Sequence, residues 1–289
     1  MTRIVPHLWF DTQAAEAAEF YVALFENSRV LSRTKIADTP SGTTELVVAR
    51  LAGQEFQLLS AGPQFRFTPA ISFLVACASE DEVNRLHAAL AQGGSDLMPL
   101  GPYPFAERYA WVMDRWGVSW QVMYRSSLGG GPKITPTLMF VGAQCGRCET
   151  AIGRYAELFG GAVSYVDRYE AGPGLDKPGT VRHAAFTMAG QGFAAMDSAH
   201  PHLFGFNEAV SLLVLCDNQN EIDRLWAALS ADPAAEACGW LKDEFGVSWQ
   251  ISSPLLEKLM NVQDPDRKAR VTRAMLAMKK LDLAALENA

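Results

Sequence analysis

The sequence predicts an α+β protein in which one mixed module of about 130 residues occurs twice. Two observations predict this class: three landmarks recur in the same order in both halves of the chain, and each half alternates strand and helix patterns. The 289 residues, 49% of them hydrophobic, can bury two cores. We expect modules at 1–127 and 134–254, a Gly-rich linker at 128–133 and a helical extension at 255–289.

The landmarks are short segments that differ little between the copies. The third is the most similar, because both copies read Trp-x2-Asp-x2-Gly-Val-Ser-Trp-Gln. Three matches in the same order, with length differences only between them, indicate a duplication rather than chance. The landmarks pair residues 4–10 with 134–140, 65–73 with 204–212 and 111–121 with 240–250.

The elements of the first half-module follow from residue periodicity. Residues 7–10 form a short apolar run that favours a strand. Residues 14–25 place Ala17, Phe20, Tyr21 and Leu24 at the spacing of one helix face. Two further strands, 45–50 and 55–60, are predicted on either side of an Ala-Gly turn.

The second half-module repeats this order. A buried strand is predicted over 70–75, and Ser79 with Glu82 forms a capping box that starts a helix. The closing hairpin turns at 114–117, with Gly117 where a positive φ costs little. Each module is therefore predicted to consist of two βαβββ-like halves.

Charge and apolar runs exclude several partners. The 25 Lys and Arg residues against 32 Asp and Glu give a net charge of −7 without a polybasic run, so nucleic acid is not an expected partner. No secretory leader and no run of about 20 apolar residues is present, which favours a cytoplasmic protein without a membrane partner.

Five cysteines, an odd number, favour reduced thiols. The Gly-rich stretch is followed by a strand pattern, which favours a linker over a phosphate loop.

With these motifs, the chain resembles the vicinal oxygen chelate superfamily, the glyoxalase and bleomycin-resistance fold. It is most similar to the PhnB-like branch, whose members carry the label 3-demethylubiquinone-9 3-methyltransferase. The similarity is strongest over 134–289, in the segments 204–211, 216–219, 238–243 and 246–250, and looser over 1–127, where residues 8–11 fit well. It implies tandem modules with cupped mixed sheets, arranged as a pseudo-dimer within one chain; a homodimer stays open. Methyl transfer is not expected, because no glycine-rich loop joins a parallel strand to a helix.

Superfamily enzymes hold a divalent metal in the cup with His and carboxylate ligands. The resemblance implies that a glyoxalase-like pairing would build one cup from His7, Gln57, Ala209 and Gln250. This set offers one imidazole and neutral amides, so no cofactor is firmly expected; nickel, zinc, iron or manganese at His7 is the alternative. The other cup would contain Thr137, Ala194, Ala70 and Gln121.

The same inward positions describe a cup for a small molecule. Glutamines supply donors and acceptors, and tryptophans supply flat apolar walls. We expect the cup to bind a small polar or aromatic metabolite, whether or not it also turns it over. Two classes stay open: a non-catalytic binding protein, which the missing carboxylates favour slightly, and a metal-dependent lyase, isomerase or dioxygenase using His7. Trp120 and Trp249 alternate with the glutamines and are expected in the core. The expected cup residues are His7, Trp9, Gln57, Trp111, Gln121, Trp240 and Gln250.

Other reactive residues have simpler interpretations. Cys145 and Cys148 have redox spacing at a predicted helix start, but a structural role is favoured because the first copy has no counterpart. His183 is expected on a strand, and His200 and His202 on a loop that could touch a metal. The tail over 266–286 is predicted to be helical, and one side of it is apolar: Val271, Ala274, Met275, Met278 and Leu281.

Overall fold

The computed structural model describes residues 2–126 and 131–289 of the chain, which divide into two compact units. Unit 1 consists of Met1–Arg66 and Asn207–Ala289, and unit 2 consists of Phe67–Phe206. Each unit therefore combines one half of the first sequence repeat with one half of the second. Residues 127–130, which include half of the predicted linker, lie outside the described residues.

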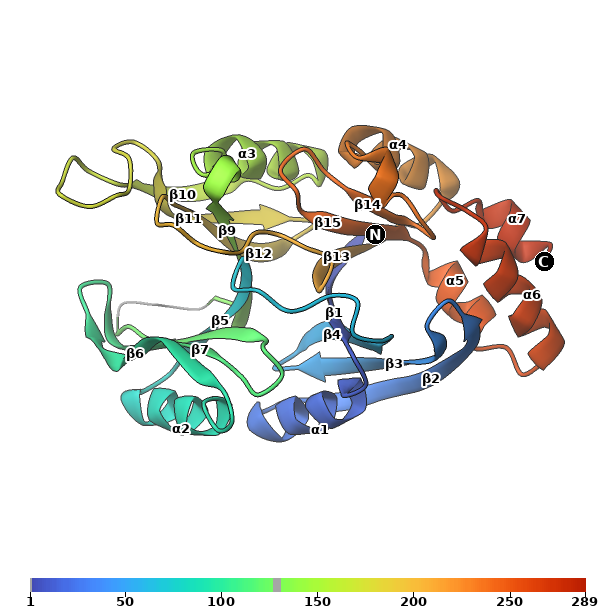
Figure 1. Ribbon diagram of the computed structural model, residues 1–289, viewed down its shortest axis with the longest axis horizontal. Coiled ribbons are helices and arrows are strands. Elements are labelled where there is room, and N and C mark those ends of the chain that lie inside the picture. The colour runs from blue at the N-terminus through green and yellow to red at the C-terminus, as the bar shows by residue number, and fades with distance from the viewer. Residues whose placement is uncertain (1, 127–130) are drawn as a thin grey trace. The chain divides into compact units, whose positions relative to one another are not determined.

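Unit 1 contains a seven-stranded mixed sheet in the order β14-β15-β13-β1-β4-β3-β2 (Figure 1). Strands β1 and β13, which come from different repeats, pair antiparallel at its centre. The elements are β1 Arg3–Phe10, α1 Ala14–Leu24, β2 Arg29–Thr39, β3 Gly42–Leu51, β4 Gln54–Ser60, β13 Val210–Leu215, α4 Gln219–Leu229, η2 Pro233–Ala235, β14 Trp240–Lys242 and β15 Ser248–Ser252.

Unit 2 contains an eight-stranded sheet in the order β10-β11-β12-β9-β5-β8-β7-β6. Its central pair, β5 with β9, again joins the two repeats. The elements are β5 Ile71–Cys77, α2 Glu80–Leu90, β6 Ser95–Tyr103, β7 Ala106–Met113, β8 Ser119–Tyr124, β9 Ile134–Val141, η1 Gly142–Gln144, α3 Cys148–Leu158, β10 Val163–Arg168, β11 Val181–Met188 and β12 Gln191–Ser198.

The predicted fold class is confirmed, with three local corrections. The first strand begins at Arg3 rather than His7, and strands β2 and β6 had no predicted range. The last half-unit has three strands instead of four, because residues 233–235 form the short helix η2 before β14. Strands β2 and β6 are half-exposed edge strands, so their apolar pattern is weak.

Each sheet has one face covered by helices and one opposite face, which we call the open face. In unit 1, α1 packs on β3 and β4. The alternation of side chains along β1 places Leu8 and Phe10, exposed by 0% and 2%, beneath this helix. The same alternation places Val5, His7 and Trp9 on the open face.

The repeated Asp-x2-Gly-Val-Ser-Trp motif closes the last hairpin of each unit. In unit 2, Asp114 Oδ1 accepts from the backbone N–H groups of Trp116 and Val118, and Oδ2 accepts from Trp120 Nε1 at 3.0 Å. Asp243 makes the same three bonds in unit 1, to Phe245, Val247 and Trp249. Trp120 and Trp249 are fully buried, as predicted, so this motif stabilises the fold.

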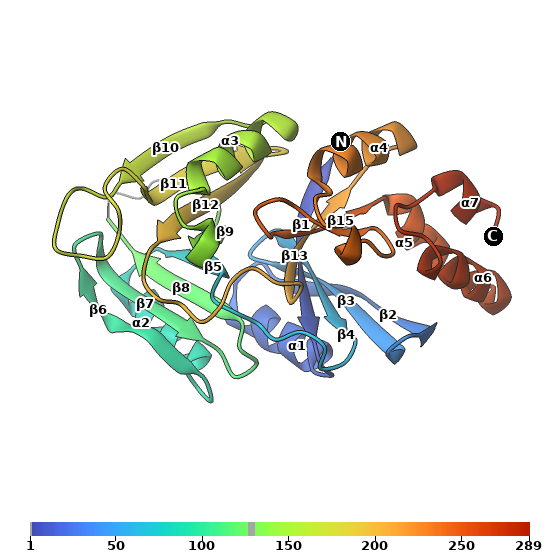
Figure 2. The ribbon, with the colours of Figure 1, turned by 45° about the horizontal axis from the view of Figure 1, so that its top comes forward.

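The C-terminal extension belongs to unit 1 and consists of α5 Pro254–Met260, α6 Pro265–Leu276 and α7 Leu283–Glu287 (Figure 2). A single helix over 266–286 was therefore wrong, because residues 277–282 leave the helical path. The predicted apolar side does pack into a cluster with Leu259, Met260 and Leu286. No helix among residues 2–126 and 131–289 combines the length and apolar character needed to cross a bilayer.

Candidate active or binding face of unit 1

His7 lies at the centre of the open face of unit 1. It pairs in register with Gln57 on the parallel strand β4 and with Ser211 on the antiparallel strand β13. Residues in direct register project to the same side of a sheet, so these three side chains line one patch. The strand order that brings them together depends on the contact between β1 and β13, whose residues are about 200 positions apart in the sequence.

The His7 imidazole is buried and carries a nitrogen without a partner. The residue is 3% exposed, and no described group hydrogen-bonds to Nδ1. Burial lowers the pKa of His7 from 6.5 to about 3, since an imidazolium would lose its hydration there. The ring is therefore neutral at physiological pH, with one nitrogen able to accept a hydrogen bond or bind a metal.

Three aromatic side chains form a row that begins at His7. Trp240 on β14 packs edge-on against the imidazole at a centroid distance of 5.6 Å and against Trp9 at 6.1 Å. Phe65 meets Trp9 at 5.0 Å, and Trp9 Nε1 donates to the Gly62 carbonyl at 2.9 Å. All three aromatic residues are half-buried, so part of each remains accessible. The patch therefore joins flat apolar surfaces to a neutral imidazole.

Two glutamines and one carboxylate complete the polar part of the patch. Gln250 Nε2 donates to Ser211 Oγ at 3.0 Å. Gln57 Nε2 donates to Glu257 Oε1 at 2.8 Å, which brings α5 of the extension onto the open face. Burial, followed by repulsion from Glu55, raises the pKa of Glu257. Glu257 could not be selected from the sequence, because the extension lies outside the repeat and has no counterpart.

The open face of unit 2 carries the equivalent positions, but its glutamine bonds to a tyrosine as well as to the serine. Tyr109 donates to Gln121 Oε1 at 2.7 Å, and Gln121 Nε2 donates to Ser72 Oγ at 2.7 Å. Thr137 is 1% exposed and bonds to the backbone of its own strand. Ala194 pairs in register with Thr137, and Ala70 accepts a backbone bond from Met139. These positions contain no ionisable ligand.

Aromatic packing also distinguishes the unit 2 face. Tyr103 and Phe105 both pack against Tyr109, at 5.4 and 5.0 Å. Burial raises the pKa of Tyr109, which stays a hydrogen-bond donor. In unit 1 the position of Tyr109 in the repeat is taken by Cys238, which has no aromatic ring.

Trp111 and Trp240, two of the tryptophans expected to line the cups, occupy equivalent positions in the closing hairpins but have different partners. Trp111 in unit 2 donates from Nε1 to Ser119 Oγ at 2.7 Å. Its counterpart in unit 1, Trp240, packs on His7 and Trp9, and Ser248 Oγ is buried with no described partner. Unit 1 thus holds two unpaired buried polar atoms on one face, His7 Nδ1 and Ser248 Oγ. An unpaired buried polar atom costs free energy, and two more are found among the described residues, Gln54 Nε2 and Gln191 Nε2.

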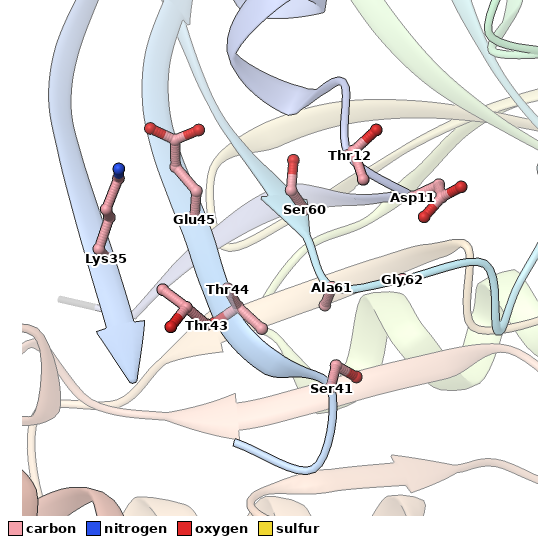
Figure 3. A pocket seen from close by; sticks show the side chains of 10 residues that line it. All are labelled: Asp11, Thr12, Lys35, Ser41, Thr43, Thr44, Glu45, Ser60, Ala61 and Gly62. Carbon is pink, nitrogen blue, oxygen red and sulfur yellow. The ribbon is translucent and has the colours of Figure 1, made fainter. Parts of the chain in front are cut away.

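A separate polar pocket of 450 Å³ lies where β1, β3 and β4 end in unit 1. Figure 3 shows the hydroxyls of Ser41, Thr43 and Ser60 around it, with Lys35 and Glu45 on neighbouring strands. Ser60 Oγ already accepts from the backbone of Ala14. This pocket has no aromatic wall and no unpaired buried group. The open face is therefore the stronger candidate, and it contains the predicted residues His7, Trp9, Gln57, Trp240 and Gln250.

The Cys145–Cys148 segment is a turn in which Cys148 is buried and Cys145 is partly exposed. Asp197 Oδ1 accepts from the backbone N–H groups of Gly146 and Cys148, and Oδ2 accepts from Val181. Burial raises the pKa of both thiols, and the charge of Asp197 raises it further. Thiols held protonated are poor nucleophiles, so this segment anchors the start of α3.

The histidines outside the patch do not form a metal site. His183 lies on β11, where burial lowers its pKa. His200 lies 3.5 Å from Asp176, and His202 bonds to Ser198 at 2.9 Å. Within the described part of the chain, no three His, Cys, Asp or Glu side chains are placed to hold a metal ion. On the open face of unit 1 the donors are one imidazole, two amides and Glu257, a set that does not fit a tightly held divalent cation.

Comparison with known proteins identifies the family. A family model described as 3-demethylubiquinone-9 3-methyltransferase matches residues 2–123 and again residues 132–252. A PhnB protein from Bacillus cereus, titled a 3-demethylubiquinone-9 3-methyltransferase, is 36% identical over 42% of this chain and 98% of its own, with a TM-score of 0.39. No curated protein matches the chain.

The tandem arrangement is similar to that of a plant enzyme of known structure. Glyoxalase I from Zea mays covers 90% of this chain and 96% of its own length, with a TM-score of 0.54 and 12% identity. At this identity the likeness shows the fold alone. Because the family model covers most of the chain in two copies, the protein belongs to the PhnB-like family that carries the 3-demethylubiquinone-9 3-methyltransferase description, within the vicinal oxygen chelate fold.

Proposed function

We propose that the open face of unit 1 binds a small metabolite that has a planar ring and at least one polar group. Trp9 and Trp240 would contact the ring, and His7, Gln57 and Gln250 would bond to the polar groups. The observation that carries this proposal is the neutral, enclosed imidazole of His7, whose Nδ1 has no described partner beside half-buried indole rings. A buried polar atom without a partner costs free energy, which a ligand can recover.

A thermal-shift screen of planar metabolites, followed by calorimetry on the hits, tests the proposal. We expect His7→Ala and Trp240→Phe to weaken binding by about tenfold, or about 1.4 kcal/mol. Thr137→Ala and Trp111→Phe alter the equivalent positions of unit 2 and serve as matched controls that should bind normally. Equal losses in both units would contradict the choice of unit 1, and a screen without any stabilising compound would contradict small-molecule binding.

We also propose that this chain does not transfer methyl groups. In the described sheets, the connections from β1, β5 and β13 to the helices that follow them contain no glycine. The connection from β9 to α3 contains Gly142 and Gly146, but the N–H groups of Gly146 and Cys148 there already bond to Asp197. None of these connections has the Gly-x-Gly-x-x-Gly pattern of a cofactor-binding loop. We therefore expect calorimetry to detect no binding of S-adenosylmethionine, even at millimolar concentrations of this ligand. A stoichiometric binding isotherm would overturn this proposal.

We propose that the site works without a resident metal, because one imidazole and one carboxylate among amides form a weak donor set. The alternative is a metal-dependent lyase, isomerase or dioxygenase that uses His7. Metal analysis of protein purified without chelator separates the two. Stoichiometric nickel, zinc, iron or manganese that is lost in His7→Ala, but kept in Thr137→Ala, would support the alternative.

A further inference from the structure

We infer that Glu257 of the C-terminal extension is a specificity-determining residue of the unit 1 face, and that it selects aromatic ligands carrying an amine or another cationic hydrogen-bond donor. The inference rests on the proposed binding function and names its ligand class. It is drawn from the placement of one carboxylate, delivered by a segment outside the repeated modules, over the patch that contains His7.

The extension holds Glu257 in a defined position. Ser253 caps α5 by accepting from Leu255 N–H, and Glu257 lies in the first turn of this helix. At the end of α5, Asn261 Oδ1 accepts from Thr34 Oγ1 of β2 at 2.9 Å. Leu259 and Met260 are 6% exposed and belong to the apolar cluster of the extension. Because both ends of α5 are held, the Glu257 side chain loses little conformational freedom when a ligand binds, and it can therefore discriminate between ligands.

The Glu257 carboxylate has bonding capacity left for a ligand. Gln57 Nε2 is the one described side chain that donates to it, and a carboxylate can accept about four hydrogen bonds. The cation acting on it is Arg3, which pairs with Glu55 at 3.1 Å. Glu257 has no ion pair of its own among the described residues. A half-buried carboxylate without an ion pair is stabilised when a cationic group of a ligand binds to it.

The spacing of the patch suits a small aromatic amine. Gln57 lies on the strand next to that of His7 and Trp9, and neighbouring strands are about 4.8 Å apart. A ring against Trp9 and Trp240 therefore leaves a short side chain within reach of the carboxylate beside Gln57. Tryptophan faces also attract cations, so the aromatic and acidic parts favour the same ligand class.

Three probes with one ring and different end groups test the inference: 2-phenylethylamine, 2-phenylethanol and 3-phenylpropionate. We expect the wild-type chain to bind the amine about tenfold more tightly than the alcohol, and the carboxylate most weakly, by tryptophan fluorescence and ligand-observed NMR. Glu257→Gln keeps an acceptor for Gln57 but removes the charge, so it should abolish the preference for the amine. Glu257→Lys should reverse it toward 3-phenylpropionate. Glu287→Gln removes an equal charge from the exposed α7 and should change nothing.

The outcomes separate this inference from the proposed function. Equal binding of the three probes, with loss of all three in Trp240→Phe, would overturn the role of Glu257 and leave the binding face standing. A preference for the amine that survives Glu257→Gln would also overturn it. If none of the probes binds to folded wild-type protein, the aromatic amine class is wrong, whereas the metabolite screen still decides the proposed function. Unfolding temperatures of the variants show whether each is folded.

Discussion

The open faces of units 1 and 2 descend from the same repeat and place glutamine at the same position of the last strand, yet their polar groups are used differently. In both units this glutamine donates to a serine, and in unit 2 Tyr109 also donates to Gln121. In unit 1, Cys238 replaces the tyrosine, and Trp240 packs on His7 instead of bonding to a serine. Equivalent positions in the two units therefore have different roles: in unit 2 they stabilise the fold through hydrogen bonds, while in unit 1 His7 Nδ1 and Ser248 Oγ have no described partner and can bond to a ligand.

The extension reinforces this difference. It forms an edge beside β14 of unit 1, where Cys238 N–H donates to the Met278 carbonyl and Gly239 N–H donates to the Lys279 carbonyl. Gly239 has a φ of +89°, and a Cβ there would lie 2.9 Å from the Ile251 carbonyl oxygen. Unit 1 therefore has two features without an equivalent in unit 2. One is the contact of the extension with β14, which requires glycine at position 239, and the other is Glu257.

The largest expected effect on stability concerns the Asp-x2-Gly-Val-Ser-Trp motif, which both units contain. Asp114→Ala and Asp243→Ala each leave three N–H groups, at least two of them buried, without this acceptor. Each variant should therefore lose about 3 to 5 kcal/mol of unfolding free energy. Urea denaturation measures this loss. Similar losses in the two units would show that the repeated motif serves stability in both. A loss below about 1 kcal/mol in either variant would contradict the stabilising role of the hydrogen bonds to this aspartate.

A smaller effect is expected where the units diverge. Tyr109→Phe keeps the ring but removes the donor to Gln121, and should lower the stability by about 1 to 2 kcal/mol. Ligand binding at unit 1 should not change. A control variant, Tyr103→Phe, removes a hydroxyl that bonds only to the backbone of an edge strand and should cost less. Loss of ligand affinity in Tyr109→Phe would show that unit 2 takes part in binding.

The smallest effect distinguishes the two equivalent serines. Ser119→Ala removes the acceptor of Trp111 Nε1 and should destabilise the chain by about 1 kcal/mol. Ser248→Ala removes a buried hydroxyl without a described partner, so the free protein should be unchanged or slightly more stable. Thermal unfolding of both variants tests this contrast. Equal destabilisation would mean that Ser248 has a partner in solution and that the faces differ less than we infer.

Several features could be predicted from the sequence because they depend on local patterns. The duplication, helix α1, the Ser79 capping box and the hairpin turn at Gly117 follow from periodicity, cap residues and turn chemistry within a few residues. The burial of Trp120 and Trp249 followed from the alternation of side chains along a strand.

Other features were decided by the tertiary structure, since they depend on residues far apart in the chain. Pairing of β1 with β13, and of β5 with β9, assembles each sheet from both repeats. The bond of Glu257 to Gln57, the bond of Tyr109 to Gln121 and the unpaired Nδ1 of His7 arise from that packing. A hydrogen-bond partner is set by distance and direction in three dimensions, whereas periodicity reports only which face of an element a residue occupies.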